Sequence, residues 1–249
     1  MDALLGTISI GTGGLGLVQG GTHSASVADN CLVRNEWLCG EYVSSRQDEI
    51  LAALSQHVLI TVLSVGIGLL AAFPLALLAR RRRSLKNLVL GASTMVYTVP
   101  SLALLSVLLP FTGLSITTVV VALALYSLTI LVRNIVAGLD SVPDDVVDAA
   151  TGMGFAPRRL LWRVQVPLAL PAVFAGLRVA TVSTIALTTI GFLVGFGGLG
   201  NLINDGLNSF FRPQVLVASV LCVVLAVVAD LLLLALQKGL TPWTRGVRT

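Results

Sequence analysis

The sequence predicts an all-α protein that crosses a membrane several times, and its composition and its long uncharged runs both indicate this. The chain of 249 residues is 55% hydrophobic and only 11% charged, with a mean hydropathy of +0.93. A soluble domain has about a quarter charged residues, so this chain could not cover its surface with polar groups. Backbone groups in lipid must pair within their own segment, so the apolar runs are expected to be helices.

Stretches without Asp, Glu, Lys or Arg locate the predicted spans, because a helix needs roughly 20 apolar residues to cross a bilayer. These stretches are residues 50–79, 87–132, 179–204 and, interrupted only by Asp230, 213–237. The second is long enough for two crossings, and the turn residues Pro110-Phe111-Thr112-Gly113 divide it. We therefore expect five core spans, near residues 57–79, 88–109, 115–137, 171–194 and 214–236.

The basic residues predict how the chain is oriented. If five spans alternate, only Arg34, Arg46 and Arg212 fall on one side. The opposite side receives Arg80, Arg81, Arg82, Arg83, Lys86, Arg133, Arg158, Arg159, Arg163, Lys238, Arg245 and Arg248. Cytoplasmic loops carry such an excess of Lys and Arg. We expect a multi-pass protein of the cell membrane with its amino terminus outside, and with residues 138–170 and the carboxyl terminus in the cytoplasm.

The first forty residues allow more than one interpretation. Seven glycines occur within residues 6–21, and Asp2 stands where a signal peptide would show positive charge. This segment is either a loose outer tail, an additional short membrane-dipping helix, or the product of an over-extended start site. Cys31 and Cys39 lie in the outward segment and could form a disulfide in an oxidising compartment. Cys222 lies in an apolar helix and is expected in the core.

The polar loop between the third and fourth spans has helix signals of its own. Ser141 and Asp144 have the spacing of a capping box, and Pro143 suits the first turn of a helix. The acidic residues that favour its start are Asp144, Asp145 and Asp148. Gly152 and Gly154 then interrupt the helix. A second amphipathic segment contains Arg158, Arg159 and Arg163 and is ended by Pro167. The prediction is a helical hairpin that can enter a cleft on a partner; the alternative is a solvated connection between two spans.

The loop resembles the EAA motif of bacterial ATP-binding-cassette (ABC) importer permeases, in which Glu-Ala-Ala, three residues, Gly, nine residues and Ile-x-Leu-Pro follow one another. Here the order is Asp148-Ala149-Ala150, three residues, Gly154, nine residues, and Val164-Gln165-Val166-Pro167. Asp for Glu keeps the charge, and Val for Ile and Leu keeps the apolar character. In that family the loop is a coupling helix that docks in a groove of an ATPase subunit. The resemblance implies that the coupling residues are Asp148, Ala149, Ala150, Gly152, Met153, Gly154, Val164 and Pro167.

A narrower resemblance concerns the transported compound, or cargo. The segments that are similar to osmoprotectant permeases are Gly152-Met153-Gly154, Ala175-Gly176-Leu177-Arg178, Thr189-Ile190-Gly191 and Gly195-Phe196-Gly197-Gly198-Leu199-Gly200. That subfamily takes up glycine betaine, choline, carnitine or proline betaine. Methionine and other amino-acid importers share part of the pattern, so an amino-acid permease is the alternative.

The resemblance covers about residues 50–245 and implies the type I importer permease fold. Its domains would be an extracytoplasmic segment at 1–49, a transmembrane domain at 50–237 with the coupling loop at 140–167, and a cytoplasmic tail at 238–249. The implied partners are a separate ATPase, an extracytoplasmic binding protein and a second permease chain, either identical or paralogous. A nucleic-acid partner is not expected. The chain itself is expected to be no enzyme and to hold no cofactor, with ATP and magnesium bound by the ATPase.

Other motifs do not indicate chemistry in this chain. Residues 195–200 satisfy Gly-x-Gly-x-x-Gly, but no predicted strand precedes them, so they are read as a turn into a partly re-entrant segment near Asp205-Gly206-Leu207. The sequence contains no P-loop, so any ATP must bind elsewhere. His23 and His57 have no Cys or carboxylate at ligand spacing, which argues against a metal site.

Two groups of residues within the spans have a structural and a functional interpretation. Asp230 and Arg178 are expected to be structural, with each reaching toward the cytoplasmic face. An aromatic cage could hold a quaternary ammonium group, although aromatic stripes more often serve packing. The residues concerned are Tyr97, Tyr126, Phe192 and Phe196. A secondary transporter would need an internal repeat or several buried ionisable groups, and a membrane enzyme would need a catalytic constellation; the sequence shows neither.

Overall fold

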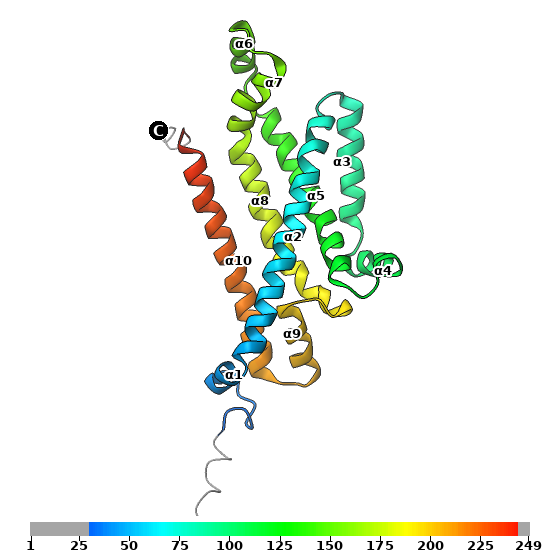
Figure 1. Cartoon of the computed structure of the whole chain (residues 1–249), viewed down its shortest axis with the longest axis vertical. Helices are drawn as coiled ribbons and strands as arrows, with labels where there is room; N and C mark the ends of the chain where they lie inside the picture. Colours follow the sequence, from blue (N-terminus) through cyan, green and yellow to red (C-terminus); the bar gives the residue numbers. More distant parts are fainter. Residues whose placement is uncertain (1–29, 244–249) are drawn as a thin grey trace, which may run out of the picture.

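The computed structural model of the chain describes residues 30–243, which form helices joined by short turns and contain no strand (Figure 1). The helices are α1 (Gly40–Ser45), α2 (Gln47–Ala79), α3 (Arg83–Thr98), α4 (Ser101–Thr112), α5 (Ile116–Asp140), α6 (Asp144–Gly152), α7 (Pro157–Leu160), the π-helical η1 (Leu161–Gln165), α8 (Val166–Thr188), the 3-10 helix η2 (Thr189–Val194), α9 (Leu199–Asn208) and α10 (Arg212–Leu240). The glycine-rich segment at 6–21 and His23 lie outside the described residues.

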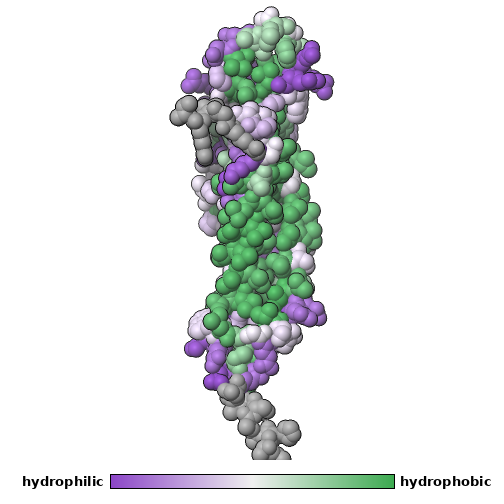
Figure 2. All heavy atoms as spheres, turned by 90° about the vertical axis from the view of Figure 1, so that its left-hand side faces the viewer, coloured by the Kyte–Doolittle hydropathy of each residue, from purple (hydrophilic) through white to green (hydrophobic). Residues whose placement is uncertain are grey.

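Four helical stretches are long and apolar enough to cross a membrane: α2, α5, the continuous run Pro157–Val194, and α10. Each contains one of the expected spans. Figure 2 shows the corresponding band of hydrophobic side chains between two hydrophilic ends, on the face that carries α10. The expected span at 88–109 differs, because α3 and α4 meet there at an angle of 96°.

The bend between α3 and α4 lies at Pro100, inside the expected span, and was not predicted from the sequence. Proline forces the residue before it into extended backbone, and Val99 has φ −67° and ψ 127°. The carbonyl oxygen of Val99 accepts a hydrogen bond from the buried hydroxyl of Tyr126 on α5, which supports the break. Pro110 lies inside α4. The turn into α5 comes at Gly113, whose φ of +69° is a conformation that glycine adopts without strain.

The core of the bundle is α5, which lies between α2 and α8 and is the most buried of the spans. Close approach of these helices depends on small residues. A methyl group added at Gly68 of α2 would lie 2.0 Å from the hydroxyl oxygen of Ser127 on α5, and one added at Gly176 of α8 would lie 2.3 Å from the Cβ of Asn134 on α5. Small residues let helix backbones approach closely where lipid gives no hydrophobic drive to association.

The two ends of the bundle differ in composition. The α2–α3 turn, α6, α7 and the end of α10 lie at one end, and α1 and α9 lie at the other (Figure 1). Ion pairs join the basic block to the end of α5: Arg80 Nε lies 3.3 Å and Lys86 Nζ 2.5 Å from the carboxylate oxygens of Asp140. The predicted grouping of basic residues at one end is therefore confirmed for those within 30–243. Arg245 and Arg248 lie outside the described residues.

At the opposite end, Cys31 and Cys39 form the disulfide that the sequence allowed. The loop that they close carries Asn35 to the corner between α9 and α10. The Asn35 side chain donates to the carbonyl oxygen of Phe210 at 2.8 Å and accepts from the backbone N–H of Arg212 at 2.8 Å. It thereby pairs one of the backbone donors that the start of α10 leaves free. Cys222 is half-buried beside the adjacent apolar cluster.

The packing at Gly68 can be tested with a matched pair of substitutions in α2. Gly68→Leu is expected to destabilise the protein by about 1–3 kcal/mol, because the added side chain must displace α5. Gly66→Leu is the control, because a methyl group at Gly66 meets nothing within 4 Å. Thermal unfolding of the purified proteins in detergent measures the difference. Equal midpoints for the two variants would contradict the importance of this contact.

Candidate functional site

The loop after α5 forms the predicted hairpin, which projects from the end of the bundle as α6 and α7 (Figure 1). Asp144 and Asp145 lie in the first turn of α6, where the helix dipole favours negative charge. The predicted capping box does not form. The hydroxyl of Ser141 instead donates to the carbonyl oxygen of Gly138 at 2.8 Å, and Pro143 precedes α6 as its N-cap. Ser141 therefore ends α5, since short polar side chains often bond to carbonyls of the preceding turn.

The turn between α6 and α7 is a Schellman motif built on Gly154. The N–H of Gly154 donates to the carbonyl oxygen of Thr151 at 2.9 Å, and the N–H of Phe155 donates to that of Ala150 at 3.2 Å. Gly154 has φ +82°, and a methyl group there would meet nothing within 4 Å. Glycine is required at this position by backbone conformation and not by space.

The predicted coupling residues gather on the hairpin. Ala150 is buried, Val164 and Pro167 are half-buried, and the exposed members are Asp148, Ala149, Gly152, Met153 and Gly154. Met153 is the most prominent apolar side chain, with 72% of its surface exposed. A shallow groove is lined by Asp145, Val146, Ala149, Ala150, Met153 and Val164. The structure thus brings together residues of α6 and η1 on a single apolar surface with acidic residues beside it.

Pro167 does not end a helix, which corrects the sequence prediction. The helix continues from Pro157 to Val194, and Pro167 lies in the first turn of α8. A proline lacks the N–H and clashes with the carbonyl four residues earlier in an α-helix. The wider π-helical turn of η1 precedes Pro167, and such turns accommodate this defect without breaking the helix.

Side chains at the base of the hairpin attach it to α2. The ring of Trp162 stacks on Phe73 with centroids 5.5 Å apart. The guanidinium of Arg80 donates to the side-chain oxygen of Gln165 at 3.2 Å. Because η1 is continuous with α8, the base of the hairpin is attached to two of the bundle helices.

The glycine-rich segment at 195–200 serves tight packing at the far end of the bundle. The N–H of Gly198 donates to the side-chain oxygen of Gln56 at 3.0 Å, and a methyl group at Gly198 would lie 2.7 Å from the Cβ of His57. The buried imidazole of His57 bonds through Nε2 to the carbonyl oxygen of Ile185 at 3.0 Å, where α8 gives way to η2. Nothing in the sequence indicated these contacts of Gln56 and His57 on α2.

Within residues 30–243, His, Cys, Asp and Glu form no cluster of three or more that could hold a metal ion.

The four aromatic residues considered for a cargo cage fall in two places. The rings of Tyr97 and Tyr126 meet edge to face with centroids 5.9 Å apart; Tyr126 is buried and Tyr97 is half exposed. Phe192 and Phe196 lie in and after η2, where Phe196 packs against the apolar cluster around Ile60. The first pair supports the α3–α4 break, and the contribution of all four to a cargo path stays a prediction.

Arg178 and Asp230 form an ion pair that joins α8 to α10. The guanidinium Nε and Nη2 lie 2.7 Å from the two carboxylate oxygens, a bidentate geometry. These residues are 52 positions apart in the sequence, so their pairing was not predicted. Two isolated opposite charges in otherwise uncharged spans were the signal that could have indicated the pair.

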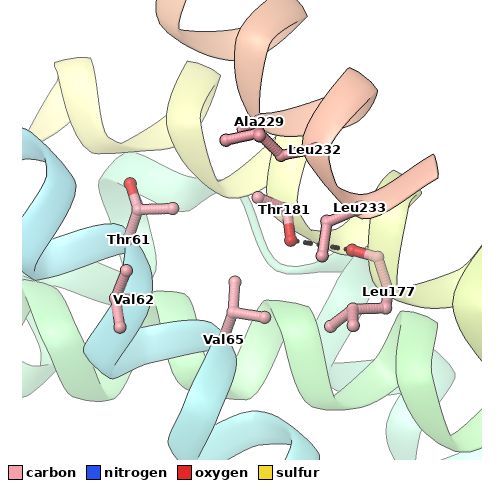
Figure 3. A pocket seen from close by; sticks show the side chains of 8 residues that line it. All are labelled: Thr61, Val62, Val65, Leu177, Thr181, Ala229, Leu232 and Leu233. Atoms are coloured by element: carbon pink, nitrogen blue, oxygen red, sulfur yellow. Dashed lines mark hydrogen bonds between the residues drawn. The ribbon is translucent and has the colours of Figure 1, made fainter. Parts of the chain in front are cut away.

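An apolar cavity of about 300 Å³ lies between α2, α8 and α10 (Figure 3). Its wall is formed by Thr61, Val62, Val65, Leu177, Thr181, Ala229, Leu232 and Leu233. The hydroxyl of Thr181 donates to the carbonyl oxygen of Leu177 at 2.8 Å. No charged residue lines this cavity, so the side of α8 that faces α2 is apolar.

Comparisons with known proteins agree over most of the chain. Residues 64–246 match the family described as "Binding-protein-dependent transport system inner membrane component". The osmoprotectant import permease protein OsmW of Salmonella typhimurium is 37% identical over 205 residues, which cover 80% of this chain and 94% of that protein. The glycine betaine/carnitine/choline transport system permease protein OpuCD of Bacillus subtilis is 35% identical over 204 residues, which cover 82% of this chain and 89% of that protein.

The solved structures extend this agreement to the fold. A structure of the MetNI methionine ABC transporter in an inward-facing conformation matches with a TM-score of 0.73 over 79% of this chain and 98% of the matched chain. The sequence identity is 19%, so this likeness concerns the fold. The predicted all-α, multi-pass architecture is confirmed.

Proposed function

Because this chain belongs to the family of binding-protein-dependent transport system inner membrane components and has the type I ABC importer permease fold, we propose that it forms the translocation path for quaternary-amine osmoprotectants. The cargo class is glycine betaine, choline or carnitine. The observation that carries the proposal is the 35–37% identity, over four-fifths of the chain, to permeases named for these compounds. The chain is a transport subunit and not an enzyme.

The proposed orientation places the hairpin and the carboxyl terminus in the cytoplasm and the amino terminus outside. The ion pairs of Arg80 and Lys86 with Asp140 hold the basic block at the hairpin end, and such blocks favour the cytoplasmic side. The domains are then an extracytoplasmic segment at 1–49, a transmembrane domain at 50–237 and a cytoplasmic tail at 238–249.

The proposed partners follow from this orientation. A separate ATPase binds ATP and magnesium and docks on residues 140–167. This hairpin projects from the bundle, exposes apolar residues around a shallow groove, and can enter a cleft of that subunit. A binding protein delivers cargo to the outer end, and a second permease chain, identical or paralogous, completes the path. ATP-driven closure of the ATPases would move the hairpin, and the contacts of Trp162 and Gln165 with α2 would transmit that movement to the bundle.

Uptake in cells tests the cargo class. Labelled glycine betaine and choline are expected to enter cells that contain this chain and to stop entering when it is deleted, with competition by quaternary amines only. Restoration by a plasmid copy is the control. Loss of methionine uptake in the deletion, with glycine betaine uptake unchanged, would replace the osmoprotectant proposal by an amino-acid permease of the same fold.

A substitution at Gly154 tests the coupling role of the hairpin. Gly154→Val places a side chain at φ +82°, which costs about 1–2 kcal/mol for an L-residue, and should disturb the turn. We expect uptake to fall severalfold while ATP hydrolysis no longer responds to the loaded binding protein, measured in proteoliposomes.

The control for this experiment is Gly239→Val, because Gly239 is an exposed helical residue of α10 and a methyl group there meets nothing within 4 Å. This variant should transport normally. Wild-type uptake by the Gly154→Val protein, at equal amounts in the membrane, would remove the hairpin from the coupling mechanism.

A further inference from the structure

The Arg178–Asp230 pair lies far from the ends of its helices. Arg178 comes twelve residues after the start of α8, which is about 18 Å at 1.5 Å per residue, and Asp230 comes ten residues before the end of α10, which is about 15 Å. The hydrocarbon layer of a bilayer is about 30 Å thick, and α10 with its 29 residues is about 43 Å long, so a centred α10 holds Asp230 about 8 Å inside the hairpin side of that layer. Ionised groups at such depth are costly, face protein or water in preference to lipid, and mark transport pathways.

The pair opens onto a pocket of about 480 Å³ on the side of α8 away from the apolar cavity. Its wall consists of Ala175, Arg178, Val179, Val182, Ser183 and Asp230. The side chains of Arg178 and Asp230 are 29% and 31% exposed, so each can be reached from the pocket. The other residues are small or β-branched, and Ser183 adds one hydroxyl. The volume lies in the range of small-molecule sites.

We propose that Arg178 and Asp230 form a transient intramembrane site for a zwitterion that carries both a carboxylate and a quaternary ammonium group. This proposal rests on the proposed function and narrows its cargo. The guanidinium of Arg178 takes the carboxylate through two parallel hydrogen bonds. The carboxylate of Asp230 faces the ammonium group, which has no hydrogen to donate and is held by charge alone.

Charge balance explains why a zwitterion suits this site. When the site is empty, the two side chains neutralise each other with both hydrogen bonds made. A zwitterion inserted between them gives each side chain an opposite partner, so every charge is paired both in the empty and in the occupied site. Breaking a pair without replacement would leave an uncompensated charge, which is strongly unfavourable away from water.

The same requirement that both side-chain charges stay paired discriminates between zwitterionic and purely cationic cargoes. Choline has the ammonium group and no carboxylate. When its ammonium group takes the place of Arg178 beside the Asp230 carboxylate, the guanidinium of Arg178 is left without a partner. The site therefore favours glycine betaine and carnitine over choline at the level of the permease. A purely structural ion pair would hold α8 to α10 and would make no such distinction.

The test compares both compounds with the whole transporter, purified in nanodiscs with its ATPase. Thermal stability is measured with glycine betaine or choline added at tens of millimolar, because a ligand that binds the folded state raises the midpoint. Glycine betaine should raise the midpoint of the wild type and choline should not. Arg178→Gln should abolish the response to glycine betaine, and Arg178→Lys should keep a smaller one. Arg46→Gln, at an exposed ion pair with Glu49, is the matched control and should respond as the wild type does.

Uptake by the same proteins in proteoliposomes with the binding protein gives the second readout. Arg178→Gln should lower glycine betaine uptake on the order of tenfold, because the cargo carboxylate loses both bonds of a bidentate, charge-assisted pair, and should leave any choline uptake within about twofold. Equal responses to both compounds in the wild type, or an unchanged betaine response in Arg178→Gln, would overturn the site. Absence of all quaternary-amine uptake in the wild type, with uptake of an amino acid instead, would overturn the proposed function itself.

Discussion

The close packing of α5 between α2 and α8 is the constraint on which the rest of the structure depends. Gly68 and Gly176 allow side chains of α5 to fit against the neighbouring backbones, and few other residues could occupy those positions. In lipid, helices gain little from burying apolar surface, so this steric fit supplies much of the specificity of packing. Once the three helices are fixed, the hairpin that follows α5 and leads into α8 has both of its ends anchored in the core.

Different contacts hold the two ends of the bundle. At the hairpin end, stacking of Trp162 on Phe73 joins η1 to α2, and η1 is continuous with α7 and α8. At the other end, the side-chain oxygen of Gln56 accepts a hydrogen bond from the N–H of Gly198 in the glycine-rich turn, and the imidazole of His57 bonds to the carbonyl oxygen of Ile185 on α8. These contacts tie α2 to the glycine-rich turn and to α8 at the end opposite the hairpin.

The sequence predicted the spans and the hairpin well, because bilayer thickness and turn chemistry act on short, contiguous stretches. It failed where the outcome depended on contacts of the folded chain. The bend at Pro100 was not predicted, and the hydroxyl of Tyr126 meets the carbonyl of Val99 beside that bend only in the folded chain. Ser141 could cap α6 or end α5, and the backbone geometry decided for α5. Contacts between distant positions, such as Arg178 with Asp230, leave no local pattern.

The α8–α10 pair has two chemically different sides. These helices lie close together near α9 and diverge toward the hairpin end (Figure 1), and α10 is the least buried of the spans. On the side facing α2, the space between the helices is lined by apolar residues and two threonines. On the other side, the ion pair is the only charged group that lines the pocket. Charge within a membrane is stable only if that side meets protein or water. The position of one ion pair thus gives α8 an apolar side toward α2 and an opposite, charged side that is not suited to lipid.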